Sequence, residues 1–449
     1  MKRHRFFLSA LLLPLLLAGA GAQSTPASPL GFKLGDMQVT PGGFIDFTLF
    51  YRTTTVGSGI GTNFAGIPAN NSIAGRLSEF GESVQNSRLT LKVSAPSGHL
   101  YGYLETDFLG SAPGNVAVSS NSNTMRMRVF FVDYQHGAWE LMAGQDWSLL
   151  TPSKTGLSPM PSDVAYGSTV DTNYHVGLTW ARQPQVRLLY HASPNFTLGL
   201  SFENGQPYAG GSSGAPKVTL PGGDSGPYAK QVNTGSSGFG ASDTTPDIIA
   251  KVAYDSAPAG HGWHLEVAGL ESQFRVFNPA LNRTQHAAGA GVEADAAYSF
   301  GGGLRLFATS FFGDGGGRYF YGMAPDLIIR QNGAPSPVLS QGGMLGAEVS
   351  LDPADKLYAY YGGLTIHPNF DLSGATPVGY GYPGASTGQN RSLQEATLGL
   401  NHTFWKSARL GSLQLMTQAS YLVRTPFTAA DGAHAHAVMG FVNLRYTLP

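Results

Sequence analysis

The sequence Arg88-Leu-Thr-Leu-Lys-Val-Ser-Ala-Pro-Ser-Gly-His-Leu-Tyr-Gly-Tyr-Leu-Glu-Thr-Asp107 contains two short segments in which apolar and polar residues alternate, separated by a break rich in Pro, Ser and Gly. A period of two residues places alternate side chains on opposite faces of a β-strand, so each segment has one face suited to lipid and one suited to water. The break has the composition of a tight turn. The stretch therefore predicts two antiparallel strands joined by a short connection.

The same pattern recurs from Phe44 to the C-terminus, and the breaks are alternately short and long. Short breaks lie near 95–98, 135–138, 192–195, 256–261, 300–302, 352–355 and 406–410. Long breaks lie near 53–85, 110–123, 148–175, 205–245, 276–286, 314–342, 365–392 and 425–435. Seven short connections interleaved with eight long ones require an even number of strands, with both chain ends on one side. We predict an all-β fold, a 16-stranded antiparallel transmembrane β-barrel with long extracellular loops and short periplasmic turns.

Two segments give more detailed predictions. Residues 176–190 are interpreted as one long strand with a bulge at Pro184, because two strands there would make the total odd. In the strand that follows residue 124, the alternation places four apolar residues on one face and two arginines on the other. The apolar residues are Met125, Met127, Val129 and Phe131, and the arginines are Arg126 and Arg128.

The N-terminus has the pattern of a secretory signal peptide, with Lys2, Arg3 and Arg5 before the apolar core Phe6–Leu17 and the small residues Ala20-Gly-Ala22. We expect a signal peptide over 1–22 that is cleaved near Ala22, a short periplasmic N-terminal segment over 23–43, and a β-barrel porin domain over 44–449. The expected location is the bacterial outer membrane. The chain has no Cys, which excludes disulfides and a lipid-modified cysteine.

The sequence and its charge also argue against membrane-spanning helices and against a nucleic-acid partner. After residue 22 no run approaches the roughly 18 apolar residues of a membrane-spanning helix. The formal net charge is -1, so we expect no nucleic acid as a partner.

Charged residues on the polar faces are candidates for lining a pore. The basic candidates are Arg52, Arg88, Lys92, Arg126, Arg128 and Arg187, and the acidic candidates are Glu105, Asp107, Glu266, Glu293, Asp295 and Glu348. Opposed rows of charge would impose a transverse field on solutes in the lumen. The loop 148–175 is the candidate to fold inward and narrow the pore, with Lys154 and Asp163 facing the solute.

A second interpretation of the basic row stays open beside the first. Arg88 and Arg128 could pair with Glu105, and Arg126 could pair with Asp107, as ion pairs that brace the wall. Such cross-strand pairs contribute about 0.2–1 kcal/mol each.

We expect no catalytic residue, no metal site and no cofactor. The residues Gly313–Arg318 lack the Gly-Lys-Ser/Thr ending of a phosphate-binding loop, and His434 and His436 have no third ligand nearby in the sequence. We expect no nucleophile elbow of the Gly-x-Ser-x-Gly type, which joins a strand to a helix.

Several motifs resemble the DcaP-like porins, a family related to the phosphate-selective porins. They are Gln85-Asn-Ser-Arg-Leu89, Gly102-Tyr-Leu-Glu-Thr-Asp-Phe-Leu-Gly110, Met125-Arg-Met-Arg128, Gly144-Gln-Asp-Trp-Ser148 and Ala181-Arg-Gln-Pro-Gln-Val-Arg187. The resemblance covers mainly the first half of the barrel. It implies a trimeric sixteen-stranded channel that favours small anions such as dicarboxylates. The chain departs from the family pattern because it lacks the periplasmic coiled coil that many members carry.

Together, the pattern and the resemblance predict an outer-membrane porin, not an enzyme. The expected function is a passive aqueous channel for small hydrophilic solutes that weakly favours small anions. The expected partners are outer-membrane lipid, these solutes and two further copies of the chain in a homotrimer. The alternatives are an outer-membrane barrel enzyme of the lipase or acyltransferase type and a loop-based adhesin. Open-channel conductance separates the adhesin from a porin.

Overall fold

The computed structural model describes residues 29–115, 118–163, 168–211, 217–235, 243–257, 261–429 and 433–449. The signal peptide expected over 1–22 lies outside these residues. Among the described residues, no helix has the length and apolar character needed to cross a membrane.

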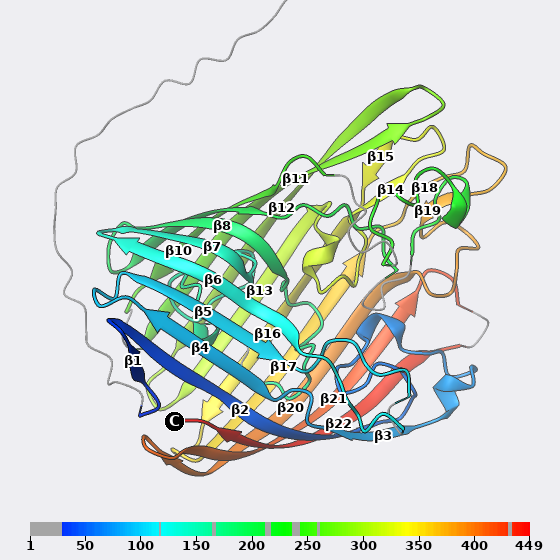
Figure 1. The fold of residues 1–449 in the computed structure, drawn as a ribbon. Helices are drawn as coiled ribbons and strands as arrows, with labels where there is room; N and C mark the ends of the chain where they lie inside the picture. Colours follow the sequence, from blue (N-terminus) through cyan, green and yellow to red (C-terminus); the bar gives the residue numbers. More distant parts are fainter. Residues whose placement is uncertain are drawn as a thin grey trace, which may run out of the picture.

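The described residues form a closed barrel whose wall has sixteen antiparallel strands (Figure 1). In chain order the wall strands are β2 (Met37–Arg52), β4 (Arg88–Ser94), β5 (Leu100–Asp107), β6 (Arg126–His136), β7 (Trp139–Trp147), β8 (Arg182–His191), β9 (Phe196–Glu203), β10 (Asp247–Asp255), β11 (Gly262–Asn278), β12 (Arg283–Ser299), β13 (Leu304–Asp314), β16 (Leu339–Ser350), β17 (Asp355–Ile366), β20 (Asn390–Ser407), β21 (Gly411–Pro426) and β22 (Ala435–Thr447). The barrel closes where β2 pairs with β22, from Phe44 opposite Thr447 to Arg52 opposite Met439. The predicted fold class is confirmed.

Shorter elements complete the described chain. They are the strands β1 (Phe32–Leu34), β3 (Glu79–Ser83), β14 (Leu327–Ile329), β15 (Pro335–Pro337), β18 (Asn369–Asp371) and β19 (Val378–Tyr380), and the 3-10 helices η1 (Phe64–Gly66), η2 (Ala74–Arg76), η3 (Pro161–Asp163), η4 (Gly223–Ser225) and η5 (Gly317–Tyr319). β3 pairs with the second half of β2 and β4 with its first half, so β3 and β4 share one position in the wall.

The wall begins earlier than predicted. β2 starts at Met37, and Gln38 to Phe44 pair with β4 from Ser94 to Arg88. Residues 37–43 therefore belong to the barrel and not to a separate periplasmic segment, because the neighbouring strand supplies partners for their backbone groups.

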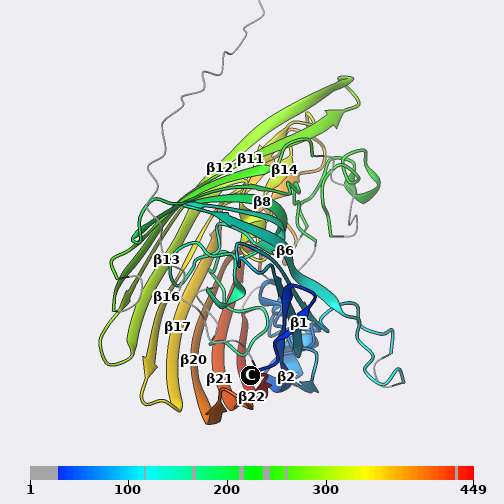
Figure 2. The same cartoon turned by 60° about the vertical axis from the view of Figure 1, so that its left-hand side comes forward.

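The connections alternate between the two ends of the barrel as predicted, but one connection that was predicted to be long is short. The long connection expected over 276–286 is a four-residue turn, 279–282, between β11 and β12, which are 17 residues each. Asn282, with φ 48°, takes the left-handed conformation that such a turn needs. The two strands extend together beyond the rest of the wall, so a hairpin and not a loose loop projects at this end (Figures 1 and 2).

Two details of the strand predictions are wrong. Residues 176–181 are not part of β8, which starts at Arg182 and runs through Pro184 with continuous pairing to β7 and no bulge. The bulge instead lies in β6, where Glu105 faces Val129 but Thr106 faces Met127. Because the extra residue, Arg128, reverses the alternation, Met127 points outward while Val129 and Phe131 are buried inside.

The outer surface of the wall is suited to lipid. Exposed apolar side chains on its outward positions include Ile45, Val267, Leu398 and Val442. Trp139, Trp263, Phe300 and Trp405 are exposed next to the short turns, where an interfacial aromatic belt would lie.

This surface gives a test of the membrane orientation. Val267 points outward near the middle of the lipid-facing part of β11 and is 57% exposed, so Val267→Arg is expected to lower the free energy of unfolding by about 2–4 kcal/mol. Leu281 lies in the turn at the tip of the projecting hairpin, and Leu281→Arg is expected to have little effect. Equilibrium unfolding by denaturant in lipid vesicles measures both. An equal, small effect of the two substitutions would contradict the assignment of the outer wall to lipid.

Candidate functional site

The connection between β7 and β8, residues 148–181, crosses the inside of the barrel, and we name it the constriction loop (Figure 2). Its Val170 N–H donates to Oε1 of Gln418 on β21 at 2.7 Å, and its Val176 N–H donates to Oε2 of Glu395 on β20 at 3.0 Å. These strands lie across the lumen from β7 and β8. The loop therefore spans the channel from one wall to the other.

Apolar packing and small wall residues let the loop approach the wall closely. Leu149, Leu150 and Leu157 of the loop are almost fully buried. A Cβ atom on Gly199 of β9 would lie 3.1 Å from Cδ1 of Leu157 and 3.2 Å from Cδ2 of Leu149. On the opposite wall, a side chain on Gly362 of β17 would collide with the carbonyl oxygen of Val176. Glycine at these wall positions makes room for the loop.

Wall carboxylates bind the backbone of the constriction loop directly. The N–H groups of Leu149, Ser153 and Gly156 donate to carboxylate oxygens of β9, β11 and β10. The acceptors are Glu203 at 2.8 Å, Glu266 at 3.1 Å and Asp255 at 2.9 Å. Hydrogen bonds to an ionised acceptor are stronger than neutral ones. The loop is therefore held in place by charge-assisted hydrogen bonds.

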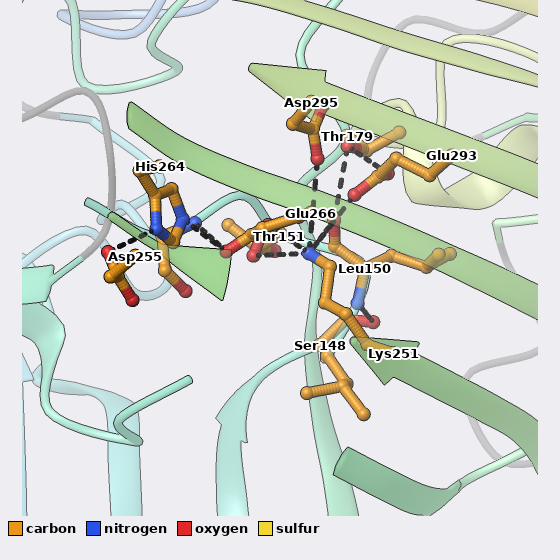
Figure 3. A network of polar contacts seen from close by, with 12 residues as sticks. Ser148, Leu150, Thr151, Thr179, Lys251, Asp255, His264, Glu266, Glu293 and Asp295 are labelled. Carbon is orange, nitrogen blue, oxygen red and sulfur yellow. Dashed lines mark hydrogen bonds and ion pairs between the residues drawn. The ribbon is translucent and has the colours of Figure 1, made fainter. Parts of the chain in front are cut away.

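A lysine that the sequence analysis did not single out lies at the centre of this arrangement (Figure 3). Lys251 of β10 places Nζ 2.6 Å from Glu266, 3.2 Å from Glu293 and 4.0 Å from Asp295. The same ammonium donates to the carbonyl oxygens of Leu150 and Thr151 of the loop, at 3.3 and 3.4 Å.

This placement changes the role of three predicted acidic residues. Glu266, Glu293 and Asp295 are 1%, 1% and 8% exposed. Glu293 also accepts a hydrogen bond from Oγ1 of Thr179 at 2.7 Å. The three carboxylates are buried rather than facing open water, and two of them, Glu266 and Glu293, bind the constriction loop.

Several other predicted pore residues are also occupied by structural contacts. Arg52 is fully buried, pairs with Glu79 at 2.8 Å and donates to the carbonyl oxygens of Gly59 and Ile60 in the first long loop. Arg187 is buried beside Asp146, at 3.5 Å, and donates to the carbonyl oxygen of Trp147.

The remaining members of the predicted set differ in their surroundings. Glu348 pairs with Lys356 at 2.9 Å and accepts from Ser168 of the loop at 3.4 Å. Lys92 lies over the ring of Tyr101, with Nζ 4.2 Å from the centroid. The side chain of Asp163 lies outside the described part of the structure.

The ion pairs of the second interpretation are present on β4, β5 and β6. Arg128 binds Glu105 at 2.6 Å and Asp107 at 2.7 Å, Arg126 binds Asp107 at 2.7 Å, and Arg88 lies 3.4 Å from Glu105. Arg128 is buried, whereas the side chains of Arg88 and Arg126 are 19% and 31% exposed. Arg128 therefore braces the wall, while Arg88 and Arg126 pair with acids and still reach water.

Two further arginines join this group, and neither was predicted. Arg182 at the start of β8 lies 5.2 Å from the ring centre of Trp147, which Arg128 also approaches at 5.9 Å. Arg445 of β22 pairs with Asp46 at 2.8 Å. The alternation of β22 could have identified Arg445 as inward-facing, since Phe441 and Asn443 on the same face are buried. The alternation did not identify Arg182 as a pore residue, because the predicted strand over residues 176–190 continued through this position without a boundary.

A cavity of about 160 Å³ lies between the constriction loop and this wall, and we name it the basic cavity. Its lining includes Phe44, Asn86, Arg88, Trp147, Lys154, Pro161, Ser162, Thr169, Val170, Asp171, Thr172, Tyr174 and Arg445. The guanidinium carbons of Arg88 and Arg445 lie 4.9 and 4.2 Å from the ring centre of Phe44. Three cationic side chains thus face one carboxyl group across a small polar space.

Burial shifts the pKa of two titratable groups of the loop, Asp171 and His175. Burial raises the pKa of Asp171, although the positive charge of Arg52 and hydrogen bonds from Thr62 and Asn173 oppose the shift. Burial lowers the pKa of His175 to about 4, so this ring is neutral at neutral pH. The His175 ring therefore adds no positive charge to the loop at neutral pH.

The ion pairs predict unequal costs for two neighbouring arginines. Arg128→Met leaves Glu105 and Asp107 without their shared buried partner and is expected to lower the free energy of unfolding by about 3–5 kcal/mol. Arg126→Met removes a partly exposed partner and is expected to cost about 0–1 kcal/mol. Denaturant titration of the refolded barrels measures both. Equal costs would show that the burial of Arg128 does not set its contribution.

Comparison with solved structures identifies two channels with the same fold. The outer membrane channel DcaP of Acinetobacter baumannii matches with a TM-score of 0.67 and 16% sequence identity, over 93% of this chain and 99% of that chain. The anion-selective porin from Comamonas acidovorans matches with a TM-score of 0.52 and 15% identity, over 92% of this chain and 100% of that chain. No protein-family model matches the chain, and no curated protein sequence matches it. The chain therefore has the porin fold that its resemblance to the DcaP-like porins implies.

Proposed function

We propose that the protein is a passive aqueous channel of the bacterial outer membrane that passes small hydrophilic solutes and weakly favours small anions. The observation that carries the proposal is the basic cavity, where Arg88, Arg445 and Lys154 line the space left between the constriction loop and the wall. Cations that line a narrow, low-dielectric passage lower the energy of an anion within it.

The charges around the cavity support the direction of this preference. Four of the arginines on β4 to β8 lie close to two carboxylates, Glu105 and Asp107; they are Arg88, Arg126, Arg128 and Arg182. This group carries two more positive charges than negative ones. Glu266, Glu293 and Asp295 of β11 and β12 are buried, so they contribute little to the passage.

The type of anion follows from the donors that face the space. Two guanidinium groups and an ammonium group offer several N–H donors to a solute with more than one acceptor oxygen. A small dicarboxylate has this chemistry. The likeness to a porin described as anion-selective supports the same preference.

The proposal includes the orientation of the channel in the membrane, its export and its oligomeric state. The long loops face the outside and the short turns the periplasm, the segment 1–22 is removed on export, and three copies assemble as in the family that the sequence resembles.

Single-channel recording in planar bilayers tests the function. The refolded wild-type barrel is expected to conduct, with a reversal potential in a KCl gradient that shows a preference for chloride. Arg88→Gln with Arg445→Gln removes two cations from the basic cavity and is expected to reduce that preference.

Arg409→Gln is the matched control, because Arg409 is exposed in the turn between β20 and β21. A correctly folded wild-type barrel without conductance would contradict the channel function. Unchanged selectivity in the double variant would show that the basic cavity does not set the preference.

A further inference from the structure

We propose that Lys251 is a positioning residue that holds the constriction loop against β9 to β12 and so confines the aqueous path to the basic cavity. This inference rests on the proposed channel function. It concerns a residue that does not face the cavity, because the Lys251 side chain is fully buried beneath the loop (Figure 3).

The contacts of the ammonium group connect wall and loop at one point. Nζ of Lys251 lies within ion-pair distance of Glu266, Glu293 and Asp295, from β11 and β12. It also donates to two consecutive loop carbonyls, those of Leu150 and Thr151. An ammonium has three donors, which suits it to bridge carboxylates and carbonyl oxygens together.

The carboxylates that Lys251 binds are themselves attached to the loop. Glu266 accepts from the N–H of Ser153, and Glu293 accepts from the hydroxyl of Thr179, near the other end of the loop. His264 adds a contact to Glu266 at 2.9 Å and to Asp255 at 2.8 Å. Asp255 in turn accepts from the N–H of Gly156. Both ends of the loop thus depend on one charge cluster.

The balance of charge explains why the lysine is needed. Three carboxylates whose ligand atoms lie within 4.8 Å of one another have the geometry of a cation site. The ammonium group of Lys251 supplies that cation. Removing one partner from a buried charge cluster leaves an uncompensated charge that is costly to keep from water. The carboxylates gain hydration if the loop moves away.

Release of the loop has a specific consequence for selectivity. It would widen the lumen and expose Glu266, Glu293 and Asp295 to the passing solution. Lys251→Met is therefore expected to raise the unitary conductance and to shift the reversal potential toward cations. A lysine with only a local structural role would not change selectivity in this direction.

The experiment uses the full chain, refolded into vesicles, with a cysteine reporter on the loop. The natural chain has no Cys, so Thr151→Cys introduces a single thiol. Thr151 is 5% exposed and its hydroxyl has no hydrogen-bond partner among the described residues, so this change is mild. A methanethiosulfonate reagent is expected to leave the thiol unmodified with Lys251 present and to modify it in Lys251→Met.

Two further variants separate charge from packing. Lys251→Met with Glu266→Gln and Glu293→Gln leaves Asp295 as the one remaining carboxylate of the three, while the glutamine oxygens still accept from the loop, and it is expected to restore shielding of the thiol. Lys406→Met is the control for loss of one positive charge, because Lys406 is exposed at the far end of β20.

The experiment distinguishes failure of this inference from failure of the proposed channel function. A shielded thiol and wild-type conductance in Lys251→Met would overturn the inference. If Lys251→Met does not fold, Lys251→Gln replaces it, because it removes the same positive charge and keeps a polar side chain. This variant is expected to expose the thiol and to shift selectivity toward cations, and a shielded thiol would overturn the inference. Thiol modification needs no conductance, so it tests the position of the loop even if the wild type does not conduct.

Discussion

The structure depends on how a loop inside a barrel satisfies its backbone. Away from strand pairing, each buried N–H group of the constriction loop needs an acceptor, and an unsatisfied one costs about 1–3 kcal/mol. The wall meets this need with carboxylates, and Glu203, Asp255, Glu266 and Glu395 each accept from a loop amide. These acidic residues on the lumen face therefore act as hydrogen-bond acceptors for the backbone of the loop. The negative charge of Glu266 and of its neighbour Glu293 requires a cation, and Lys251 provides it.

The two halves of the lumen consequently differ in character. Along β9 to β12 the lumen-facing charges of Lys251, Glu266, Glu293 and Asp295 are buried and paired, so this half of the lumen is a packed interior. Along β4 to β6, Arg88 and Arg126 pair with Glu105 and Asp107 and keep part of their side-chain surface in contact with water. The transverse asymmetry expected from the sequence exists in the arrangement of charges, but the acidic side does not face the solute. A weak anion preference follows from this unequal exposure and not from two opposed open rows.

The barrel was predictable because its pattern repeats. The alternation in segments such as Arg88–Val93 and the regular exchange of short and long breaks define strand number and orientation without any tertiary information. The structure differs from the sequence predictions where local backbone geometry determines which face a residue takes or how far a strand extends. The bulge at Arg128 reverses the faces of β6, and the hairpin at 279–282 replaces a long loop, since pairing between strands continued beyond the clear alternation.

The site was less predictable for a different reason. The alternation of residues places Glu266 and Glu293 on the inner face, but it does not tell whether a loop covers them. Lys251 takes its role from the carboxylate of Glu293, 42 residues away in the chain, and Arg182 takes its role from the ring of Trp147, about 35 residues away. Such contacts are properties of the closed fold and have no signature in a single strand.

The most direct test of the account is whether ions pass through the basic cavity. Ser162 lines this cavity on the constriction loop, and Ser162→Cys places the only thiol of the chain there. The measurement is the current through single channels before and after modification by a bulky methanethiosulfonate reagent. The account predicts that modification reduces the current strongly. A current that stays unchanged after complete modification would show that ions take another path and would contradict it.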